Sequence, residues 1–318
     1  MTSTARPFSS ALGWGLKRKL IVSMLMVGVV PLLLGLSLAF LQGSKEIQVV
    51  SGESFQALAT EAARKLDLLV AEEVARTSRI AVHPDIVRAL EHRRDALHAS
   101  DQNATLPTLV QQRAHWAARD PAAVKAITGN STALLLQSFY AGSQNESDQL
   151  LPQVVRAATK KLFITDVQGN LFAALTTKPG FSHAEAAWWK GTFNKGVGQL
   201  YIEDLHFDEQ ADAYVFSISL PVMDSLRYEV VGVVHRVIDA KEFFSPSTHT
   251  IRFGKTGHVM LIDSRGMVLS CPILPTGVQL SGASLIPQVT VRQPGWVTAD
   301  SDGHGGQAAV TRDSRHDG

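Results

Sequence analysis

One uninterrupted apolar segment constrains this chain more than any other feature of its sequence. Leu20 to Leu41 are 22 residues without a charged side chain. As a helix they would rise about 33 Å, which is enough to cross the ~30 Å hydrocarbon core of a bilayer. Pro31 lies inside the segment, and membrane helices tolerate proline because neighbouring groups satisfy the freed carbonyl. The sequence therefore predicts a transmembrane helix over residues 20–41.

The charges beside this segment predict its orientation. Lys17, Arg18 and Lys19 precede it, and the positive-inside rule keeps residues 1–19 in the cytoplasm. A cleaved signal peptide is the alternative. However, such a peptide has an apolar run of only about 7–15 residues, and no A-x-A site follows this one. We therefore expect a single-pass membrane protein with the bulk of the chain outside the cytoplasm.

Composition limits what the exported part can do. The net charge of +1 lacks the concentrated basic surface that nucleic acid requires, so we expect no nucleic-acid partner. Cys271 is the single cysteine, which excludes an internal disulfide and a multi-thiolate metal site. Asp300, Asp302 and His304 lack the spacing of a calcium loop, and no H-E-x-x-H or G-x-S-x-G motif occurs. We expect no enzyme, no cofactor and no metal site.

Residues 44–83 predict one long helix directly after the apolar segment. Apolar side chains recur at spacings of three and four from Phe55 to Leu69, and Glu and Arg fill the other face. No proline occurs in this stretch before Pro84. A helix packed in a compact bundle is the alternative, but the position after the apolar segment favours a stalk. Residues 84–150 alternate between helix-like and polar stretches.

One short phrase occurs twice in the second half of the chain. KLFITDVQGNLFAAL, residues 161–175, places Asp166 and Gly169 at the two ends of a turn between apolar runs. VMLIDSRGMVL, residues 259–269, repeats the pattern with Asp263 and Gly266, 97 residues later. We interpret the two phrases as hairpins in two copies of one module.

The elements around the first phrase predict an α+β domain. A helix-like stretch, residues 154–161, comes before it. Two runs rich in β-branched and aromatic residues, 213–222 and 228–238, are joined by a loop of hairpin length and followed by the helix-like DAKEFF. This order predicts an antiparallel sheet with helices on one side. No comparable pair of strands follows the second phrase, so we expect the second module to be incomplete.

Taken together, these motifs resemble the double Cache sensory domain of bacterial transmembrane receptors. This domain is the extracytoplasmic ligand-binding part of chemoreceptors and sensor histidine kinases. The resemblance covers roughly residues 20–298. It implies two PAS-like modules, a membrane-distal one over residues 84–244 and a partial membrane-proximal one over 245–298, before a disordered tail from 299 to 318. It also implies a homodimer in the bacterial inner membrane, with a small molecule bound in the distal module.

The resemblance also implies where a ligand would bind. Members that bind amino acids carry the pattern Tyr-x4-Arg-x-Trp and an Asp on the last distal strand. Here Ala186 stands in place of the Arg and Val237 in place of the Asp, so we expect a ligand other than a free amino acid. The expected ligand-binding residues are Phe181, Trp188, Trp189, Tyr201, Asp204 and His235.

Each of these residues also has a structural interpretation. Each aromatic residue is also typical of a core, Trp189 as much as of a pocket, and Asp204 could equally cap the turn after the strand QLYIED. His235 shares a side of its strand with Val237 by period-two alternation, but a sheet histidine is more often a satisfied core residue.

Two functions remain open at this point. The first is a signalling receptor's sensor module, whose output domain is absent from this chain, which we therefore expect to be a fragment. The second is a stand-alone, membrane-anchored binding or scaffolding protein.

Overall fold

The computed structural model describes residues 15–99, 102–142, 158–254, 257–282, 285–290 and 294–297. The predicted tail, with Asp300, Asp302 and His304, lies outside the described residues. The chain divides into two compact units, Met1–Ala57 and Leu58–Gly318.

The predicted apolar helix and the predicted stalk belong to a single helix, α1, which runs from Leu16 to Ala81 with Pro31 inside it. Among the described residues, α1 is the one helix that is long and apolar enough to cross a membrane. The next helix, α2, begins at Pro84, because a proline at the first helical position loses no hydrogen bond.

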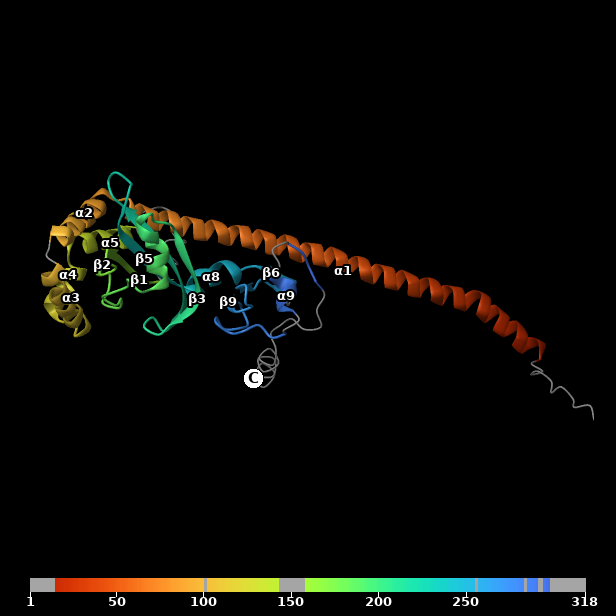
Figure 1. Ribbon diagram of the computed structural model, residues 1–318. Coiled ribbons are helices and arrows are strands. Elements are labelled where there is room, and N and C mark those ends of the chain that lie inside the picture. The colour runs from red at the N-terminus through yellow and green to blue at the C-terminus, as the bar shows by residue number, and fades with distance from the viewer. Residues whose placement is uncertain are drawn as a thin grey trace, which may run out of the picture. The chain divides into compact units, whose positions relative to one another are not determined.

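Five antiparallel strands form the main sheet in the order β2-β1-β5-β4-β3 (Figure 1). Their bounds are β1 Thr159–Asp166, β2 Leu171–Ala174, β3 Tyr201–Asp208, β4 Ala213–Met223 and β5 Val230–Asp239. The central strand, β5, is buried along its whole length. The helix expected over residues 154–161 is wrong at its end, since Thr159 already pairs with Ile238 as part of β1. β-branched and aromatic side chains in the following residues favour the strand.

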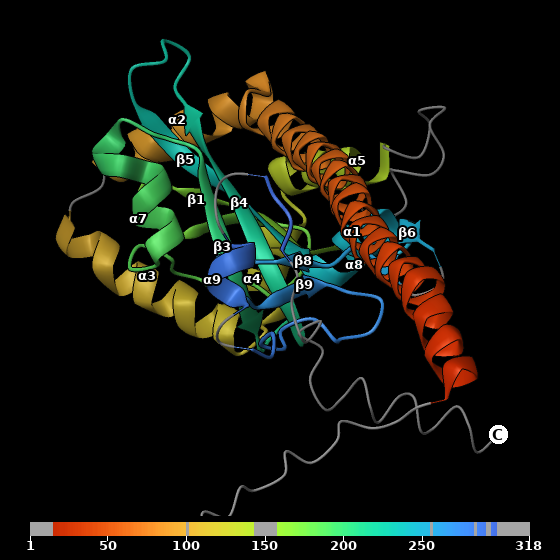
Figure 2. The same cartoon turned by 90° about the vertical axis from the view of Figure 1, so that its right-hand side faces the viewer.

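Helices cover both faces of this sheet, so the expectation of helices on one side is wrong. Side chains along each strand point alternately to the two faces. Leu162 and Ile164 pack with α2, α5 (Ser131–Gly142) and the last turn of α1, and we call this side the α1 face. Phe163 and Val233 pack on the opposite side, the α7 face, named for the helix Ala187–Phe193. Figure 2 shows α7 and α1 on opposite sides of the strands. The helices α3 (Gln102–Ala117) and α4 (Pro121–Thr128) supply further residues to the cluster on the α7 face.

The repeated phrase folds into two turns with the same hydrogen bonds. Asp166 Oδ1 accepts from the amides of Gln168 and Asn170 at 3.0 and 2.9 Å, and Asp263 Oδ1 accepts from Arg265 and Met267, both at 2.8 Å. The correspondence extends beyond the turn, because Leu171 N donates to Phe181 O and Val268 N donates to Val278 O. Every pair of equivalent residues is 97 positions apart. The sequence repeat is therefore also a structural repeat.

After β5 the described chain forms only small elements. Asp239 caps α8, Ala240–Thr248, by accepting a hydrogen bond from the Glu242 amide. The following strands form two-stranded ladders: β6 Arg252–Phe253 with β7 Gly257–His258, and β8 Leu261–Ile262 with β9 Val268–Ser270. A short helix, α9, spans Ile286–Val289. Among the described residues, this part has no counterpart of the β4–β5 pair.

Candidate functional site

One row of side chains crosses the whole α7 face of the sheet. The five strands are in register at these positions, because Phe163 pairs with Ala174 and His235, and Ser219 pairs with His235 and Tyr201. The row therefore combines two aromatic rings with a histidine and a hydroxyl at its centre.

Helix α7 holds Trp188 directly over this row. The ring of Trp188 stacks on that of His235 with centroids 3.7 Å apart and planes at 23°, and it meets the ring of Phe163 edge-on at 5.9 Å. Its neighbour Trp189 donates from Nε1 to Thr165 Oγ1 at 3.0 Å and stacks on Phe193. The two tryptophans thus fix α7 to the sheet through one stacking contact and one hydrogen bond.

The two histidines beside Trp188 are held neutral. Burial lowers the pKa of His235 well below its usual value, and repulsion by a protonated His183 and by Lys161 acts in the same direction. Burial also lowers the pKa of His183 to about 4, although the hydrogen bond from its Nε2 to the Gly180 carbonyl opposes the shift. His235 Nδ1 lies 2.8 Å from Ser219 Oγ. The centre of the α7 face is therefore polar and uncharged at neutral pH.

A second row, two residues along each strand from the first, carries the charged side chains of this face. Lys161, Val237, Ser217 and Glu203 are paired in register across β1, β5, β4 and β3. The Lys161 side chain is 9% exposed, and its Nζ donates to Asp208 Oδ2 at 2.7 Å and Gln210 Oε1 at 2.9 Å. Ser217 Oγ donates to Glu203 Oε2 at 2.9 Å. Sequence reasoning missed Lys161 and Glu203, although period-two alternation from Phe163 and Tyr201 places them on this face.

Five of the six expected ligand residues belong to the group on the α7 face. Trp188, His235 and Tyr201 meet over the central row, and Phe181 is buried in the same cluster. Trp189 is buried beside them against Thr165. The structure does not bring Asp204 to this group, because Asp204 directly follows Glu203 in β3, so alternation directs it away from the α7 face, and its side chain is exposed.

The interpretation of Asp204 as a turn cap is wrong. The strand continues to Asp208, whose Oδ1 accepts from the amides of Gln210 and Ala211 at 2.9 and 3.0 Å. Burial acts to raise the pKa of Asp208, but hydrogen bonds from Lys161 and Ala211 hold it below its usual value.

Phe181, the sixth expected residue, lines a separate groove of about 570 Å³. The groove lies between α2, α3, α4 and β2 and contains Arg93, whose Nε donates to Asp166 Oδ2 at 3.2 Å. Phe181 therefore belongs to the buried cluster on the α7 face that contains Trp188 and also forms part of the wall of this groove.

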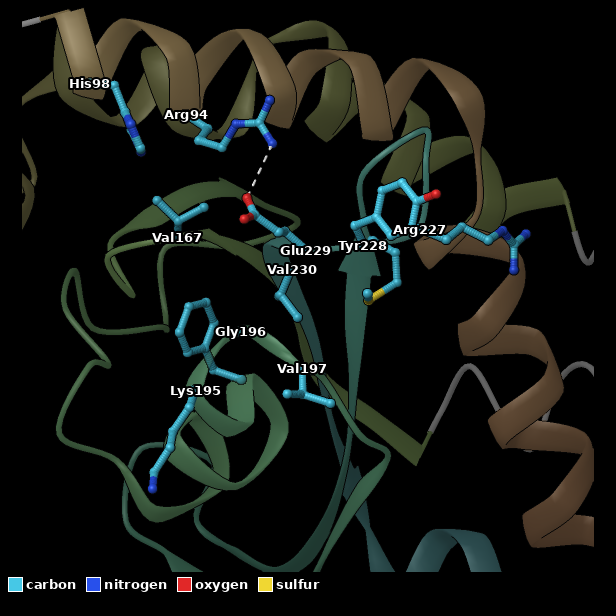
Figure 3. Close-up of a pocket in the computed structure, with 12 residues that line it drawn as sticks. Arg94, His98, Val167, Lys195, Gly196, Val197, Arg227, Tyr228, Glu229 and Val230 are labelled. Carbon is cyan, nitrogen blue, oxygen red and sulfur yellow. Dashed lines mark ion pairs between the residues drawn. The ribbon is translucent and has the colours of Figure 1, made fainter.

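A third region, of about 700 Å³, opens between α2, the turn after α7 and the β4–β5 loop (Figure 3). Arg94 Nη1 lies 4.0 Å from Glu229 Oε2 across it, whereas Lys195 and Arg227 extend away from its centre. Its basic groups therefore do not converge on one point.

Residues 43–312 match the family model of the Cache domain. Similar solved structures include the extracellular domain of the putative histidine kinase rpHK1S-Z16, at 20% identity over 49% of this chain and 68% of that one, with a TM-score of 0.34. The ligand-binding domain of the Pseudomonas aeruginosa amino-acid chemoreceptor PctC, in complex with GABA, is 13% identical over 70% of this chain and 76% of that one, with a TM-score of 0.40.

The ligand-binding domain of the Campylobacter jejuni chemoreceptor Tlp3, in complex with 4-methylisoleucine, is 11% identical over 68% of this chain and 67% of that one, with a TM-score of 0.39. No curated protein matches the chain at a significant level. Because the family model covers most of the sequence, this chain belongs to the Cache domain family of ligand-binding sensor domains.

Proposed function

We propose that this chain senses a small molecule on the α7 face of its main sheet, at the group formed by Trp188, His235, Ser219 and Tyr201. The observation that supports this is the row of aromatic and uncharged polar side chains, which all five strands bring into register. Aromatic walls with a few fixed polar groups are typical of small-molecule sites.

The chemistry of this face favours a planar organic ligand rather than a free amino acid. The backbone position before α7 is occupied by Ala186, and Val237 fills the strand position, so neither supplies a charge. The ammonium of Lys161 is already paired with Asp208, and Glu203 accepts from Ser217. Since Trp188 stacks on His235, the ligand either contacts the outer side of the Trp188 ring or displaces it.

We also propose the setting in which this sensing occurs. The segment Leu20–Leu41 spans the bacterial inner membrane, with residues 1–19 in the cytoplasm and the sheet outside it. The features that support this topology are the length of the apolar part of α1 and the basic residues before it. We also propose that the chain acts as a homodimer, and this proposal rests on the resemblance to Cache receptors alone.

A thermal-shift screen of the full chain in detergent micelles tests ligand binding. We expect at least one compound in a panel of organic acids, amines and nucleobases to raise Tm. A ligand at 100 times its Kd stabilises the folded state by about 2.7 kcal/mol, which corresponds to roughly 5–10 °C for a domain of this size. Trp188→Leu should abolish that shift.

Trp116→Leu is the matched control. Trp116 is also a buried tryptophan with a hydrogen bond, from Nε1 to Pro179 O at 2.9 Å, but it belongs to α3 and does not touch His235. Both variants should lower Tm, and only the Trp188 variant should lose the ligand response. A shift that survives Trp188→Leu unchanged would place the ligand elsewhere.

A further inference from the structure

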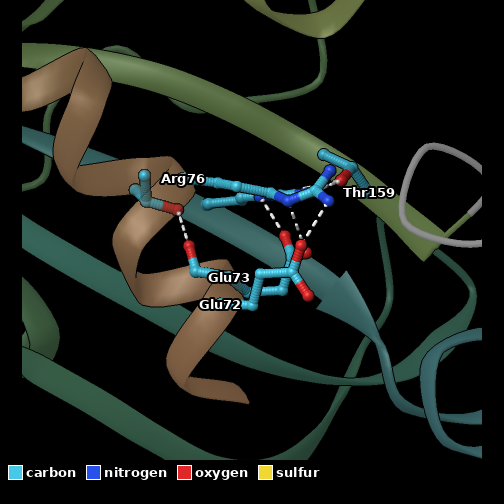
Figure 4. Close-up of polar contacts among 6 residues, drawn as sticks. Glu72, Glu73, Arg76 and Thr159 are labelled. Carbon is cyan, nitrogen blue, oxygen red and sulfur yellow. Dashed lines mark hydrogen bonds and ion pairs between the residues drawn. The ribbon is translucent and has the colours of Figure 1, made fainter. Parts of the chain in front are cut away.

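A buried ion pair joins α1 to the central strand of the sheet (Figure 4). Arg236 Nη1 donates to Glu73 Oε2 at 2.6 Å, and the two side chains are 9% and 2% exposed. Arg236 also donates from Nε and Nη2 to Thr159 Oγ1 on β1, at 3.1 and 2.8 Å. One guanidinium therefore connects three elements of the fold.

Neighbouring groups fix the Glu73 side of the pair. Arg76 Nε lies 3.5 Å from Glu73 Oε1, and the same guanidinium pairs with Glu72 at 2.6 Å. Burial nevertheless raises the pKa of Glu73 and lowers that of Arg236. Two buried charges are costly to desolvate, and apolar residues of similar size often stabilise a fold as well or better. Stability alone does not account for an ion pair at this place.

The position of Arg236 in β5 suggests another role. It directly follows His235, and consecutive residues of a strand point to opposite faces of the sheet. His235 lies under Trp188 on the α7 face, whereas Arg236 reaches Glu73 on the α1 face. A displacement of this part of β5 therefore moves both contacts together.

We propose that the Glu73–Arg236 ion pair transmits rearrangements at Trp188 and His235 to α1. Apolar side chains can slide past one another, but a buried, hydrogen-bonded ion pair keeps its geometry or breaks. A shift of β5 must consequently either carry α1 along or expose an unpaired charge. The helix that holds Glu73 is the same helix that contains Leu20–Leu41. The inference rests on the proposed function, because it takes the α7 face as the site where the ligand binds.

The test uses substitution in place of a ligand, so that failure to bind any compound and failure of this linkage are separate results. Hydrogen–deuterium exchange is measured on the full chain in detergent micelles, for peptides covering residues 66–81. In the native background, Trp188→Leu should change exchange in this segment by about 5-fold or more, the lower end of typical coupling between sites. In the background Glu73→Gln/Arg236→Met, the same substitution should leave it unchanged.

Glu72→Gln provides the matched control, because Glu72 is the adjacent acid on α1 and pairs with Arg76 without reaching β5. In that background the response to Trp188→Leu should persist. Arg236→Lys keeps the buried charge but loses the planar guanidinium that contacts both Glu73 and Thr159. This variant replaces the double variant if circular dichroism shows that the double variant is unfolded. The same loss of response is expected.

Two results would overturn the inference. One is a segment 66–81 that does not respond to Trp188→Leu even in the native background. The other is a response of equal size with and without the Glu73–Arg236 pair.

Discussion

His183 and His235 give the α7 face a specific dependence on pH. The pKa of His183 in the folded chain is about 4, below the value of about 6.5 in an unfolded chain. Between these values the unfolded state binds more protons, so stability falls as the pH falls from about 6.5 toward 4. His235 contributes in the same direction, because its pKa is also lowered.

His183→Gln isolates the first of these contributions. Between pH 7 and pH 5, His183 should cost the native protein about 2 kcal/mol of unfolding free energy. Over the same change in pH, the His183→Gln variant should lose about 2 kcal/mol less. Urea unfolding of both proteins at the two pH values measures the difference. An equal loss in the native protein and the variant would show that His183 is not buried as the neutral form.

The residues that sequence reasoning missed or misplaced lie on strands β1 and β3. Period-two alternation predicted that His235 and Val237 share a face, and the register confirms it. Counted from Tyr201, the same rule places Asp204 on the face opposite Glu203, so alternation argues against Asp204 as a member of this group. Lys161 was missed because residues 154–161 were expected to be helical, and its partner Asp208 is 47 residues away.

At the scale of elements, the repeated turn was the most predictable feature. Asp at the start of the turn accepts two backbone amides, and Gly at its end adopts a positive φ, so four residues are sufficient to encode it. The continuity of α1 from Leu16 to Ala81 was only partly predictable, since Gly43 and Ser44, which are typical of helix ends, lie between the apolar segment and the stalk and yet are inside α1. Residues 159–161, expected at the end of a helix and found in β1, show how weakly a short segment encodes its boundary.

The two copies of the turn should differ in how they tolerate alanine at the glycine. Gly169 and Gly266 have φ of +75° and +80°, so both substitutions carry the cost of a left-handed backbone, about 1–2 kcal/mol. A Cβ on Gly169 would lie 2.6 Å from the backbone nitrogen of Ala184, whereas one on Gly266 would meet the Ile286 side chain at 2.9 Å. A side chain can move aside more easily than a backbone.

We therefore expect Gly169→Ala to destabilise the chain by about 1–3 kcal/mol more than Gly266→Ala. Urea unfolding of the two variants, followed by tryptophan fluorescence, provides the comparison. Equal losses of unfolding free energy would mean that the two turns are packed alike.

At the scale of the whole molecule, the single cysteine allows the proposed topology to be tested directly. Cys271 is buried, and Cys271→Ser provides a background without thiols. In that background Ser44→Cys should react with a membrane-impermeant maleimide in cells whose outer membrane is permeabilised. Ser10→Cys should react only after the inner membrane is lysed. The reverse pattern would contradict a cytoplasmic N-terminus.

The most direct test of the central proposal is to locate the ligand on the sheet. Hydrogen–deuterium exchange of the full chain is compared with and without the compound that gives the largest thermal shift. Binding at the α7 face should protect β5 and α7, residues 230–239 and 187–193, by a factor that rises with occupancy. Protection confined to residues 108–130 or 224–229, with β5 and α7 unchanged, would place the ligand in one of the two grooves and contradict the account.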